Sequence, residues 1–388
     1  MKILHFVHTV SDIYGSFFYL KKQNEYLKSY GIEQYYIAYE ENNFPNKNSI
    51  GENEKIYILE EDTVNDLVNK VIDPDIIHFD DVYTNYVFNE TGKHKSFYEA
   101  CKNRVKVRTI HDYSSIICPK YLMHGENVYC ETPLNIECVK SNCIELSHYE
   151  GYTKYLQSLK SYDALFYFSS NIHKILQNMG MEESKLYKLP PFISGPKDYY
   201  SSESKTILFA GRLIPQKGID YLLKAAARIS TSDWNMIIAG TSDKHSYKEY
   251  VKLAKNLGIH DKVKFVGHLA QEELFEYLKR ARIMAFPSVG HETYGFSGAE
   301  AVSYGVPVVA FSIEGIDEWH KDGITGIKVP LKDIEEYARA MESLLLDDIQ
   351  YNLLRQNCIK WSKNHQLEIQ IKTLIGYYKN IAKHSEKC

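Results

Sequence analysis

Two basic side chains follow a predicted strand in the second half of the chain. The segment 209–218 reads FAGRLIPQKG and leads from the strand through Gly211 into a loop that carries Arg212 and Lys217 before a helix. Arginine offers a planar fork to phosphate oxygens, lysine a compact charge, and the start of a helix unpaired N–H groups. We therefore expect this loop to bind a diphosphate. The alternative is a pair of solvated surface cations beside a tight turn.

Two carboxylates further along the chain stand eight residues apart. Glu292 lies in the loop after another predicted strand, and Glu300 lies in the helix that this loop opens. We expect both to face one cleft, where Glu292 accepts sugar hydroxyls and Glu300 accepts ribose hydroxyls. Gly295 and Gly298 would let a ligand approach the backbone, and the helix N-terminus near Phe296 supplies positive potential for phosphate. The alternative is that Glu292 caps the helix and that Glu300 is solvated.

The elements that carry these residues alternate in type along the chain. Short β-branched or aromatic runs alternate with amphipathic stretches of helical length, which is typical of parallel sheets covered by helices on both faces. Strands are predicted at 2–8, 34–39, 75–79, 105–110, 164–168, 206–210, 234–239, 263–266, 283–287, 306–311 and, as an edge strand, 326–329. Helices are predicted at 16–30, 219–229, 246–257, 272–279 and 296–304.

The alternation is interrupted once, by a polar stretch that includes Gly, Pro and four Ser at 192–205. Such a composition is typical of a linker. A chain of 388 residues is long enough for two domains. We therefore expect an N-terminal α/β domain at 1–192, a linker at 193–205 and a second α/β domain at 206–365. Ligands of such sheets bind at the carboxyl ends of the strands, so the cleft between the domains is the expected site.

Composition excludes several function classes. Apolar residues make up 44% and charged residues 25%, as in globular proteins, and a net charge of −4 argues against a dedicated nucleic-acid binder. Residues 1–10 are too short and too interrupted by His for a signal sequence, and no run approaches the roughly 20 apolar residues of a membrane span. We expect a cytoplasmic protein whose contact with the inner face of a membrane, if it has one, is peripheral.

The motifs of the second half resemble those of GT-B fold glycosyltransferases, specifically the retaining glycosyltransferase family 4, or glycosyl transferases group 1. The matching patterns are G-R-L-x-x-x-K-G at 211–218, E-x7-E from Glu292 to Glu300, G-x-P-V-V-A at 305–310 and D-G-x-T-G at 322–326. Two departures occur: Thr293 and Tyr294 replace the commoner Pro and Phe, and Glu314-Gly315 replaces Gly-Gly. The resemblance implies two Rossmann-like domains that face each other across a cleft.

For function, the resemblance implies transfer of a sugar, with retained anomeric configuration and without a metal, from a nucleotide diphosphate sugar to a glycan or lipid-linked acceptor. Bacterial surface polysaccharide synthesis is the setting it suggests. Arg212 and Lys217 would hold the diphosphate and neutralise the charge that grows as the sugar–phosphate bond breaks. Glu300 would bind the ribose, and Glu292 would orient the sugar. The other donor-binding positions implied are Gly211, Tyr294, Gly295, Phe296 and Ser297.

The first half resembles the family less specifically. Gly15 follows the first predicted strand, where the family has a glycine-rich turn near the donor phosphates and the acceptor. His111 and Asp112 follow another strand, as the family's His-Asp pair does, which implies that His111 contacts the transferred sugar. The alternative is a packed, hydrogen-bonded histidine. The resemblance also implies that the C-terminal helix within 366–388 returns to the first domain.

The insertion at 113–144 holds four of the seven cysteines: Cys118, Cys130, Cys138 and Cys143. Their spacing contains no Cys-x-x-Cys pair, so it is a weak zinc signal. Some relatives carry a similar Cys-Pro run after His-Asp, with further cysteines downstream. Three interpretations remain: a structural zinc held by all four thiolates, one or two disulfides, or free thiols.

A basic cluster precedes this insertion and has two interpretations. It is either a solvated helix and strand end or a patch that attracts an anionic membrane surface near a lipid-linked acceptor. Its members are Lys93, Lys95, Lys102, Arg104, Lys106 and Arg108.

Other functions compete with glycosyl transfer. A GT-B sugar-nucleotide epimerase would use the same cleft, and a non-catalytic protein could bind a nucleotide sugar without turning it over. A dehydrogenase is disfavoured because no G-x-G-x-x-G follows a predicted strand with an acidic partner beyond it.

Overall fold

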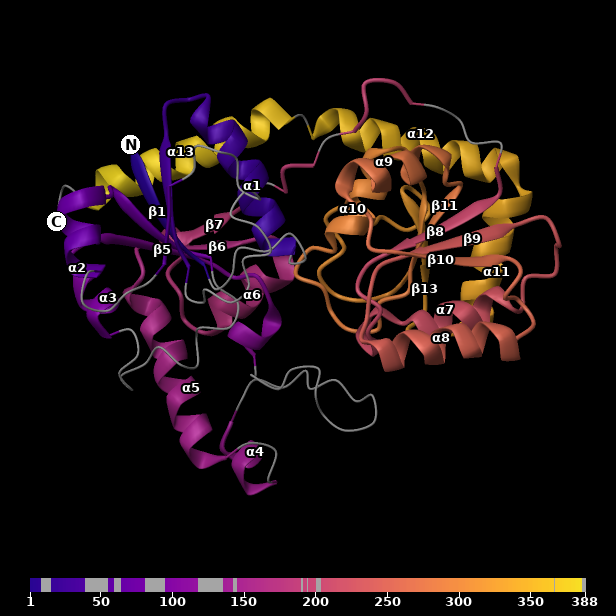
Figure 1. Cartoon of the computed structure of the whole chain (residues 1–388), viewed down its shortest axis with the longest axis horizontal. Helices are drawn as coiled ribbons and strands as arrows, with labels where there is room; N and C mark the ends of the chain where they lie inside the picture. The colour runs from indigo at the N-terminus through magenta and orange to yellow at the C-terminus, as the bar shows by residue number, and fades with distance from the viewer. Residues whose placement is uncertain are drawn as a thin grey trace. The chain divides into compact units, whose positions relative to one another are not determined.

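The computed structural model describes residues 1–7, 15–38, 55–58, 64–80, 95–117, 135–141, 145–189, 191–193, 195–199, 204–365 and 367–385. The chain forms two compact units (Figure 1). The N-terminal unit comprises Met1–Phe192 and Glu368–Cys388, and the C-terminal unit comprises Ile193–Leu367. Each unit is built on a parallel sheet with helices, so the predicted α/β fold class is confirmed. Of the helices in the described ranges, none is both long enough and apolar enough to cross a membrane.

The N-terminal unit contains a seven-stranded sheet in the order β3-β2-β1-β4-β5-β6-β7. All five strands predicted for this half are present, with each end within one residue of its prediction, whereas β3 and β7 were not predicted. The strands are β1 (Lys2–Val7), β2 (Glu33–Ala38), β3 (Lys55–Ile58), β4 (Ile76–Phe79), β5 (Val105–Thr109), β6 (Ala164–Tyr167) and β7 (Leu186–Lys188).

Helices connect these parallel strands. The predicted helix at 16–30 is α1 (Gly15–Lys28), followed by Gly31 with a φ of 72°, a conformation that glycine adopts without steric cost. The other helices are α2 (Val64–Asp66), which continues as the π-helical segment Leu67–Ile72, α3 (Lys95–Ala100), α4 (Ile136–Lys140), α5 (Leu146–Ser158), α6 (Ser170–Asn178) and the C-terminal α13 (Leu367–Ser385).

Helix α13 belongs to the N-terminal unit through contacts with its interior. The hydroxyl of Tyr378 is buried there and accepts a hydrogen bond from Gln23 Nε2 of α1 at 2.9 Å. Its ring also packs edge-on against His78 of β4. The end of the chain therefore completes the cover over one face of this sheet, as Figure 1 shows for α1 and α13.

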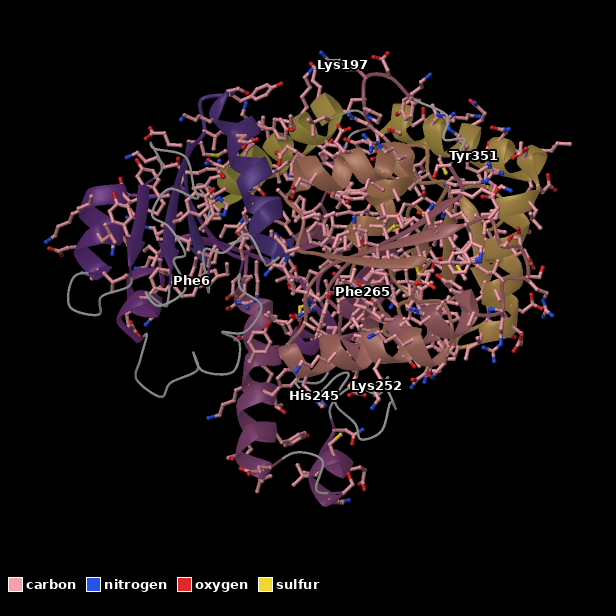
Figure 2. All side chains as sticks on the ribbon, turned by 45° about the vertical axis from the view of Figure 1, so that its right-hand side comes forward. Phe6, Lys197, His245, Lys252, Phe265 and Tyr351 are labelled. Carbon is pink, nitrogen blue, oxygen red and sulfur yellow. The ribbon has the colours of Figure 1, made fainter. Side chains whose placement is uncertain are left out.

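The two faces of this sheet differ in chemistry. Successive side chains of a strand point to opposite faces. Phe6 and Phe79 therefore lie on one face, in an aromatic core with Phe97 (Phe6 is labelled in Figure 2). His5 and His78 are paired across β1 and β4, so both point to the other face. A polar layer is thus buried beneath α1 and α13.

The C-terminal unit contains a six-stranded sheet in the order β10-β9-β8-β11-β12-β13. Every strand predicted for this half is present, and β13 lies at the edge as expected. The strands are β8 (Thr206–Ala210), β9 (Asn235–Ala239), β10 (Val263–Gly267), β11 (Ile283–Phe286), β12 (Val308–Phe311) and β13 (Gly326–Val329). The helices are α7 (Ile219–Ala226), α8 (Lys244–Asn256), α9 (Gln271–Arg280), α10 (Phe296–Ser303), α11 (Ile334–Leu346) and α12 (Asp348–Asn364).

The D-G-x-T-G pattern shapes the loop that enters β13. Thr325 Oγ1 donates to the carbonyl of Trp319 and accepts from the amide of Lys321, both at 2.8 Å. Asp322 Oδ1 accepts from the amide of Lys328 at 2.8 Å. Because these bonds satisfy backbone groups of the turn, the pattern is explained by local structure.

Candidate functional site

The loops after β8 and β11 meet at the point where the strand order of the C-terminal unit reverses. Strands β8 and β11 are neighbours, with β9 on one side and β12 on the other. The amide of Val289 donates to the carbonyl of Gln216 at 2.9 Å and joins the two loops. In open parallel sheets such a switch point is where ligands bind.

Gly218 allows these loops to approach. Its φ is 67°, and a Cβ atom there would lie well inside van der Waals contact with the carbonyl oxygen of Pro287. Only glycine satisfies both the backbone angle and the close approach. The last residue of the sequence pattern 211–218 therefore holds the β8 loop against the end of β11.

Lys217 and Glu292 are brought into direct contact by this arrangement. Lys217 Nζ lies 2.5 Å from Glu292 Oε1, and Ser288 Oγ donates to the same oxygen at 2.8 Å. The two charged side chains are only 22% and 16% exposed. Gly295, not Glu292, is the N-cap of α10, so the interpretation of Glu292 as a helix cap is wrong. Ser288 was not predicted, although it lies four residues before Glu292.

The glycines between the two glutamates make room for Trp319. Gly295 has a φ of 75°, and a Cβ at Gly298 would lie inside the indole ring's van der Waals surface. Trp319 Nε1 donates to the carbonyl of Tyr294 at 2.5 Å. The expectation that Gly298 admits a ligand is wrong on its Cβ side, because the indole fills that space. The buried ring instead holds the backbone that leads into α10.

The remaining predicted residues of this unit lie on adjoining elements. Glu300 is on the second turn of α10 and accepts a hydrogen bond from Gln271 Nε2 of α9 at 3.2 Å. Arg212 is exposed on the β8 loop. The amide of Gly211 extends the β8 ladder by donating to the carbonyl of Ala239 at 3.0 Å. Phe296 and Ser297 form the first turn of α10, where helical amides point outward along the axis.

The predicted residues of the N-terminal unit lie near its own switch point, beside β1 and β4. Gly15 is the first residue of α1, and residues 8–14 before it lie outside the described ranges. His111 follows β5, with a side chain only 5% exposed and its Nε2 3.5 Å from Asp80 Oδ1. Asp112 accepts from the amide of Ser115 at 2.9 Å, so the second residue of the His-Asp pair caps the next turn.

Comparison with known proteins identifies the C-terminal unit. Residues 197–365 match the protein-family model described as glycosyl transferases group 1. Over this segment the chain is similar to the glycosyl transferases group 1 family. An uncharacterized glycosyltransferase of Methanocaldococcus jannaschii is 36% identical over 146 residues, which are 37% of this chain and 37% of that protein. A D-inositol 3-phosphate glycosyltransferase of a Mycobacterium species is 34% identical over 142 residues, 36% of this chain and 32% of that protein. The matches thus span about a third of the length of these relatives.

The fold extends the similarity beyond the group 1 segment. The crystal structure of Anabaena HepE in complex with UDP and glucose has a TM-score of 0.74 to this protein. The alignment covers 98% of this chain and all of HepE at 15% sequence identity. At that identity the likeness concerns the fold alone, which is that of the GT-B glycosyltransferases, as the sequence resemblance implied.

Sequence reasoning missed a buried polar network in the N-terminal unit, outside the group 1 segment. His5, His78 and Asp80 have ring nitrogens and carboxylate oxygens within 4.8 Å of one another, and none is accessible to solvent beyond 4%. Burial alone would raise the pKa of Asp80, but His78, His111 and His5 hold it well below its ordinary range. The sequence feature that could have indicated this network is the presence of polar residues in buried strands. Two histidines lie inside predicted strands, and an aspartate directly follows one of them.

Acid is expected to destabilise the folded chain through its buried histidines. Burial lowers the pKa of His320, which stacks on Trp319 in the group 1 segment, to about 3, and it does the same for His78. Unfolded, each would titrate near 6.5. The unfolded chain therefore binds more protons between pH 6.5 and 3, and stability falls as the pH is lowered through this window. Each histidine should cost about 2 kcal/mol between pH 7 and pH 5.

Tryptophan fluorescence during urea unfolding measures this effect in the C-terminal unit, which contains all three tryptophans. The variant His320→Gln should lose about 2 kcal/mol less than the wild type between pH 7 and pH 5. The exposed His245 of α8 (Figure 2) supplies the control His245→Gln, which should retain the wild-type loss. Equal losses in His320→Gln and the wild type would contradict the assignment.

The structure bears on two further expectations, which concern the cysteines of the insertion and the basic cluster. Cys118, Cys130 and Cys143 lie outside the described residues, and Cys138 is a half-buried free thiol on α4. In the basic cluster, Arg108 is 2% exposed beside the rings of Tyr155 and Tyr162, so its assignment to a surface is wrong. The side chains of Lys93 and Lys95 lie outside the described residues.

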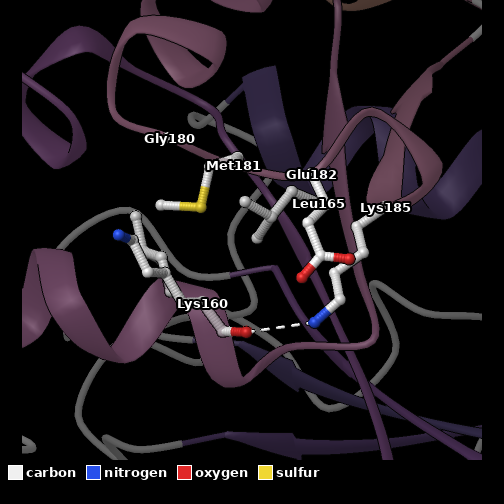
Figure 3. Close-up of a pocket in the computed structure, with 7 residues that line it drawn as sticks. Lys160, Leu165, Gly180, Met181, Glu182 and Lys185 are labelled. Atoms are coloured by element: carbon white, nitrogen blue, oxygen red, sulfur yellow. Dashed lines mark hydrogen bonds between the residues drawn. The ribbon is translucent and has the colours of Figure 1, made fainter.

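A cavity in the N-terminal unit is too small for a nucleotide sugar (Figure 3). Its volume is about 40 Å³, and Lys185 Nζ donates to the carbonyl of Lys160 across its edge at 3.1 Å. Such a volume holds at most a few water molecules. We therefore place the candidate site at the strand ends and not in this cavity.

Proposed function

We propose that the protein is a glycosyltransferase that moves a sugar from a nucleoside diphosphate sugar to a glycan or lipid-linked acceptor, with retention of configuration. The observation that carries the proposal is the ion pair of Lys217 and Glu292 at 2.5 Å, on loops that meet at the switch point of a group 1 domain. It supports donor binding because one side chain suits phosphate and the other suits hydroxyl groups.

The ion pair also suggests how the donor enters. A diphosphate is a stronger partner for an ammonium group than one carboxylate, because it carries more charge on more oxygens. On binding, Lys217 turns from Glu292 toward the diphosphate. Glu292 keeps its hydrogen bond from Ser288. Once Lys217 has left it, the Glu292 carboxylate accepts a hydrogen bond from a sugar hydroxyl. In the proposed site, Lys217 and Glu292 therefore neutralise each other until the donor binds between them.

The first turn of α10 and Glu300 complete the proposed donor site. The amides of Phe296 and Ser297 lie at the positive end of a helix and suit a phosphate oxygen. Glu300 is one turn further along and is held by Gln271, and its carboxylate suits ribose hydroxyls. This order along the helix follows the order of phosphate and ribose in a nucleotide.

In the proposed reaction the acceptor hydroxyl attacks the anomeric carbon on the face that the diphosphate leaves. The bond from carbon to phosphate oxygen breaks as the new glycosidic bond forms, and the departing diphosphate takes up the acceptor proton. Arg212 and Lys217 stabilise the negative charge that grows on the diphosphate. We propose that His111 contacts the transferred sugar. The names of relatives support this class of reaction, and the HepE complex holds UDP and glucose.

A thermal-shift screen against nucleoside diphosphates and their sugars tests the proposal. A ligand at 100 times its Kd should stabilise the folded protein by about 2.7 kcal/mol. The variants Arg212→Ala and Glu300→Ala should lose this stabilisation and abolish transfer. Arg228→Ala should keep both, because Arg228 is an exposed arginine of the same unit that pairs with Glu335. Turnover at the wild-type rate in Arg212→Ala and Glu300→Ala would contradict the assignment.

The role of Glu300 has a sharper test. Comparing a nucleoside diphosphate with its 2′,3′-dideoxy analogue isolates the ribose hydroxyls. The wild type should bind the ribonucleotide more tightly, and Glu300→Ala should bind the two alike.

Product analysis separates a transferase from an epimerase, which would convert the donor without an acceptor.

A further inference from the structure

Asp80 lies at the centre of three histidines in the interior of the N-terminal unit. Its Oδ2 is 2.7 Å from His5 Nδ1, and its Oδ1 is 3.3 Å from His78 Nε2 and 3.5 Å from His111 Nε2. The side chains of Asp80 and His5 have no exposed surface. A buried carboxylate is stable only when hydrogen bonds and opposite charge compensate for its lost hydration.

The hydrogen bonds of His5 fix where its protons lie. Gln34 Nε2 donates to Asn24 Oδ1 at 2.6 Å, so the other end of the Gln34 amide, the oxygen, faces His5 Nε2 at 3.0 Å. His5 Nε2 must then donate. The contact of His5 Nδ1 with Asp80 needs a second proton between nitrogen and oxygen. We assign that proton to His5, which makes the contact an ion pair.

The hydrogen bonds of His78 fix which of its ring nitrogens carries the proton. Gln23 Nε2 donates to the hydroxyl of Tyr378, which leaves the hydroxyl proton for His78 Nδ1 at 2.7 Å. His78 Nε2 therefore carries the ring's proton and donates it to Thr109 Oγ1 at 2.7 Å, while Asp80 Oδ1 lies 3.3 Å from the same nitrogen. Burial holds His78 neutral by lowering its pKa to about 3.

We propose that Asp80 is a positioning residue that acts through His111. As an ionised acceptor, Asp80 orients the imidazole of His111 and keeps a proton on its Nε2, so that Nδ1 is the ring nitrogen that accepts hydrogen bonds. His5 and His78 hold Asp80 in place for this purpose. The inference rests on the proposed contact of His111 with the sugar, because orientation of that ring matters only if the ring touches substrate.

Within the described residues, the charged and titratable groups closest to Asp80 come from four elements. His5 lies on β1, His78 on β4, and Arg108 and His111 on or just after β5, while Tyr378 comes from α13. The other groups of the network, Gln23, Asn24, Gln34 and Thr109, are neutral. The carboxylate is therefore the sole negative charge among these groups, and its Oδ1 lies 3.5 Å from His111 Nε2.

A metal ion is the competing explanation for two histidines and an aspartate at this spacing. The hydrogen bonds favour the network, because Thr109 Oγ1 occupies the position in front of His78 Nε2 and His5 Nδ1 lies at hydrogen-bond distance from the carboxylate. A coordinated ion would hold ligand atoms at about 2.0–2.2 Å from itself and separate them further. Metal content of the purified protein therefore bears directly on the proposal.

Steady-state kinetics of three variants test the coupling. Asp80→Asn should lower kcat about 10- to 100-fold, because a misoriented ring loses its contact with the reacting sugar, and leave KM for the donor within about twofold. His111→Gln removes the ring, so adding Asp80→Asn to it should lower kcat no further. A loss in the double variant equal to the product of the two single losses would overturn the proposal.

Nitrogen NMR of histidine tests the same contact without altering the network. In the wild-type protein, the signals absent from His111→Gln identify His111. They should report a proton on Nε2, whereas a proton on Nδ1 alone would overturn the proposal. One equivalent of bound zinc that is lost in Asp80→Asn would overturn it as well. Absence of any sugar transfer by the wild type would instead contradict the proposed function, and the NMR result distinguishes the two failures.

Discussion

Replacing Lys217 with alanine should lower kcat/KM for the nucleotide sugar about 10²- to 10³-fold. The ammonium group lies on the loop after β8, only 22% exposed, 2.5 Å from Glu292. In this partly desolvated place its charge is screened less than at the surface. Its removal deprives the departing diphosphate of a cation and leaves Glu292 to repel the donor. Both effects act on the transition state and on donor binding.

Lys224→Ala is the matched control for this prediction. Lys224 lies on α7 one to two turns beyond the loop and pairs with Asp220 at 3.2 Å, four residues away in the same helix. A partly exposed pair within one helix contributes little to stability. Lys224→Ala should therefore retain wild-type kcat/KM and unfolding temperature.

The competing view of Lys217 is a purely structural ion pair with Glu292. In that view Lys217→Ala and Glu292→Gln each lower stability, and the double variant recovers it without any separate effect on donor binding. Calorimetric titration with the nucleoside diphosphate distinguishes the two views. If Lys217→Ala bound the diphosphate as tightly as the wild type, Lys217 would have no place in the donor site.

The sequence predicted most of the sheet architecture because buried parallel strands are continuous apolar runs. Within each unit the predicted strands are present with small shifts of their ends. The strands that escaped prediction are β3 and β7, of four and three residues, which form the two edges of the N-terminal sheet. Short edge strands bury little apolar surface, so their sequences carry little of the pattern that identifies a strand.

The site was predictable where its residues stand close together in the sequence. Lys217 and Glu292 belong to local patterns, and the fold brings these patterns together at neighbouring strand ends. Gln271 and Trp319 were missed because their partners, Glu300 and Tyr294, are more than twenty residues away. Contacts at that separation depend on how the elements and loops pack in three dimensions, which spacing along the chain does not reveal.

The network around Asp80 shows the same limit. His5 and His78 share a face only because β1 and β4 pair in this register, and Tyr378 reaches them from the last helix. A strand histidine by itself is compatible with any hydrogen-bonded core position. What the sequence could have indicated is the recurrence of a polar residue on one face of two adjacent buried strands.

Gly218→Ala should destabilise the C-terminal unit by about 3 to 5 kcal/mol and abolish donor binding. Part of this loss is the strain of an alanine at a φ of 67°. The larger part is steric, because the new Cβ would overlap the carbonyl of Pro287 and force the β8 loop away from the end of β11. That movement would separate Lys217 from Glu292, so the stability loss and the functional loss have one cause.

Gly258→Ala separates the two contributions. Gly258 has a φ of 71°, close to that of Gly218, but a Cβ there would meet no atom within 4 Å. It should therefore cost only the backbone strain, about 1 to 2 kcal/mol, and leave donor binding intact. Urea unfolding followed by tryptophan fluorescence and calorimetric titration with the nucleoside diphosphate measure both effects. Equal losses in the two variants would mean that backbone strain alone explains Gly218, and that the close approach of the β8 and β11 loops does not depend on the missing side chain.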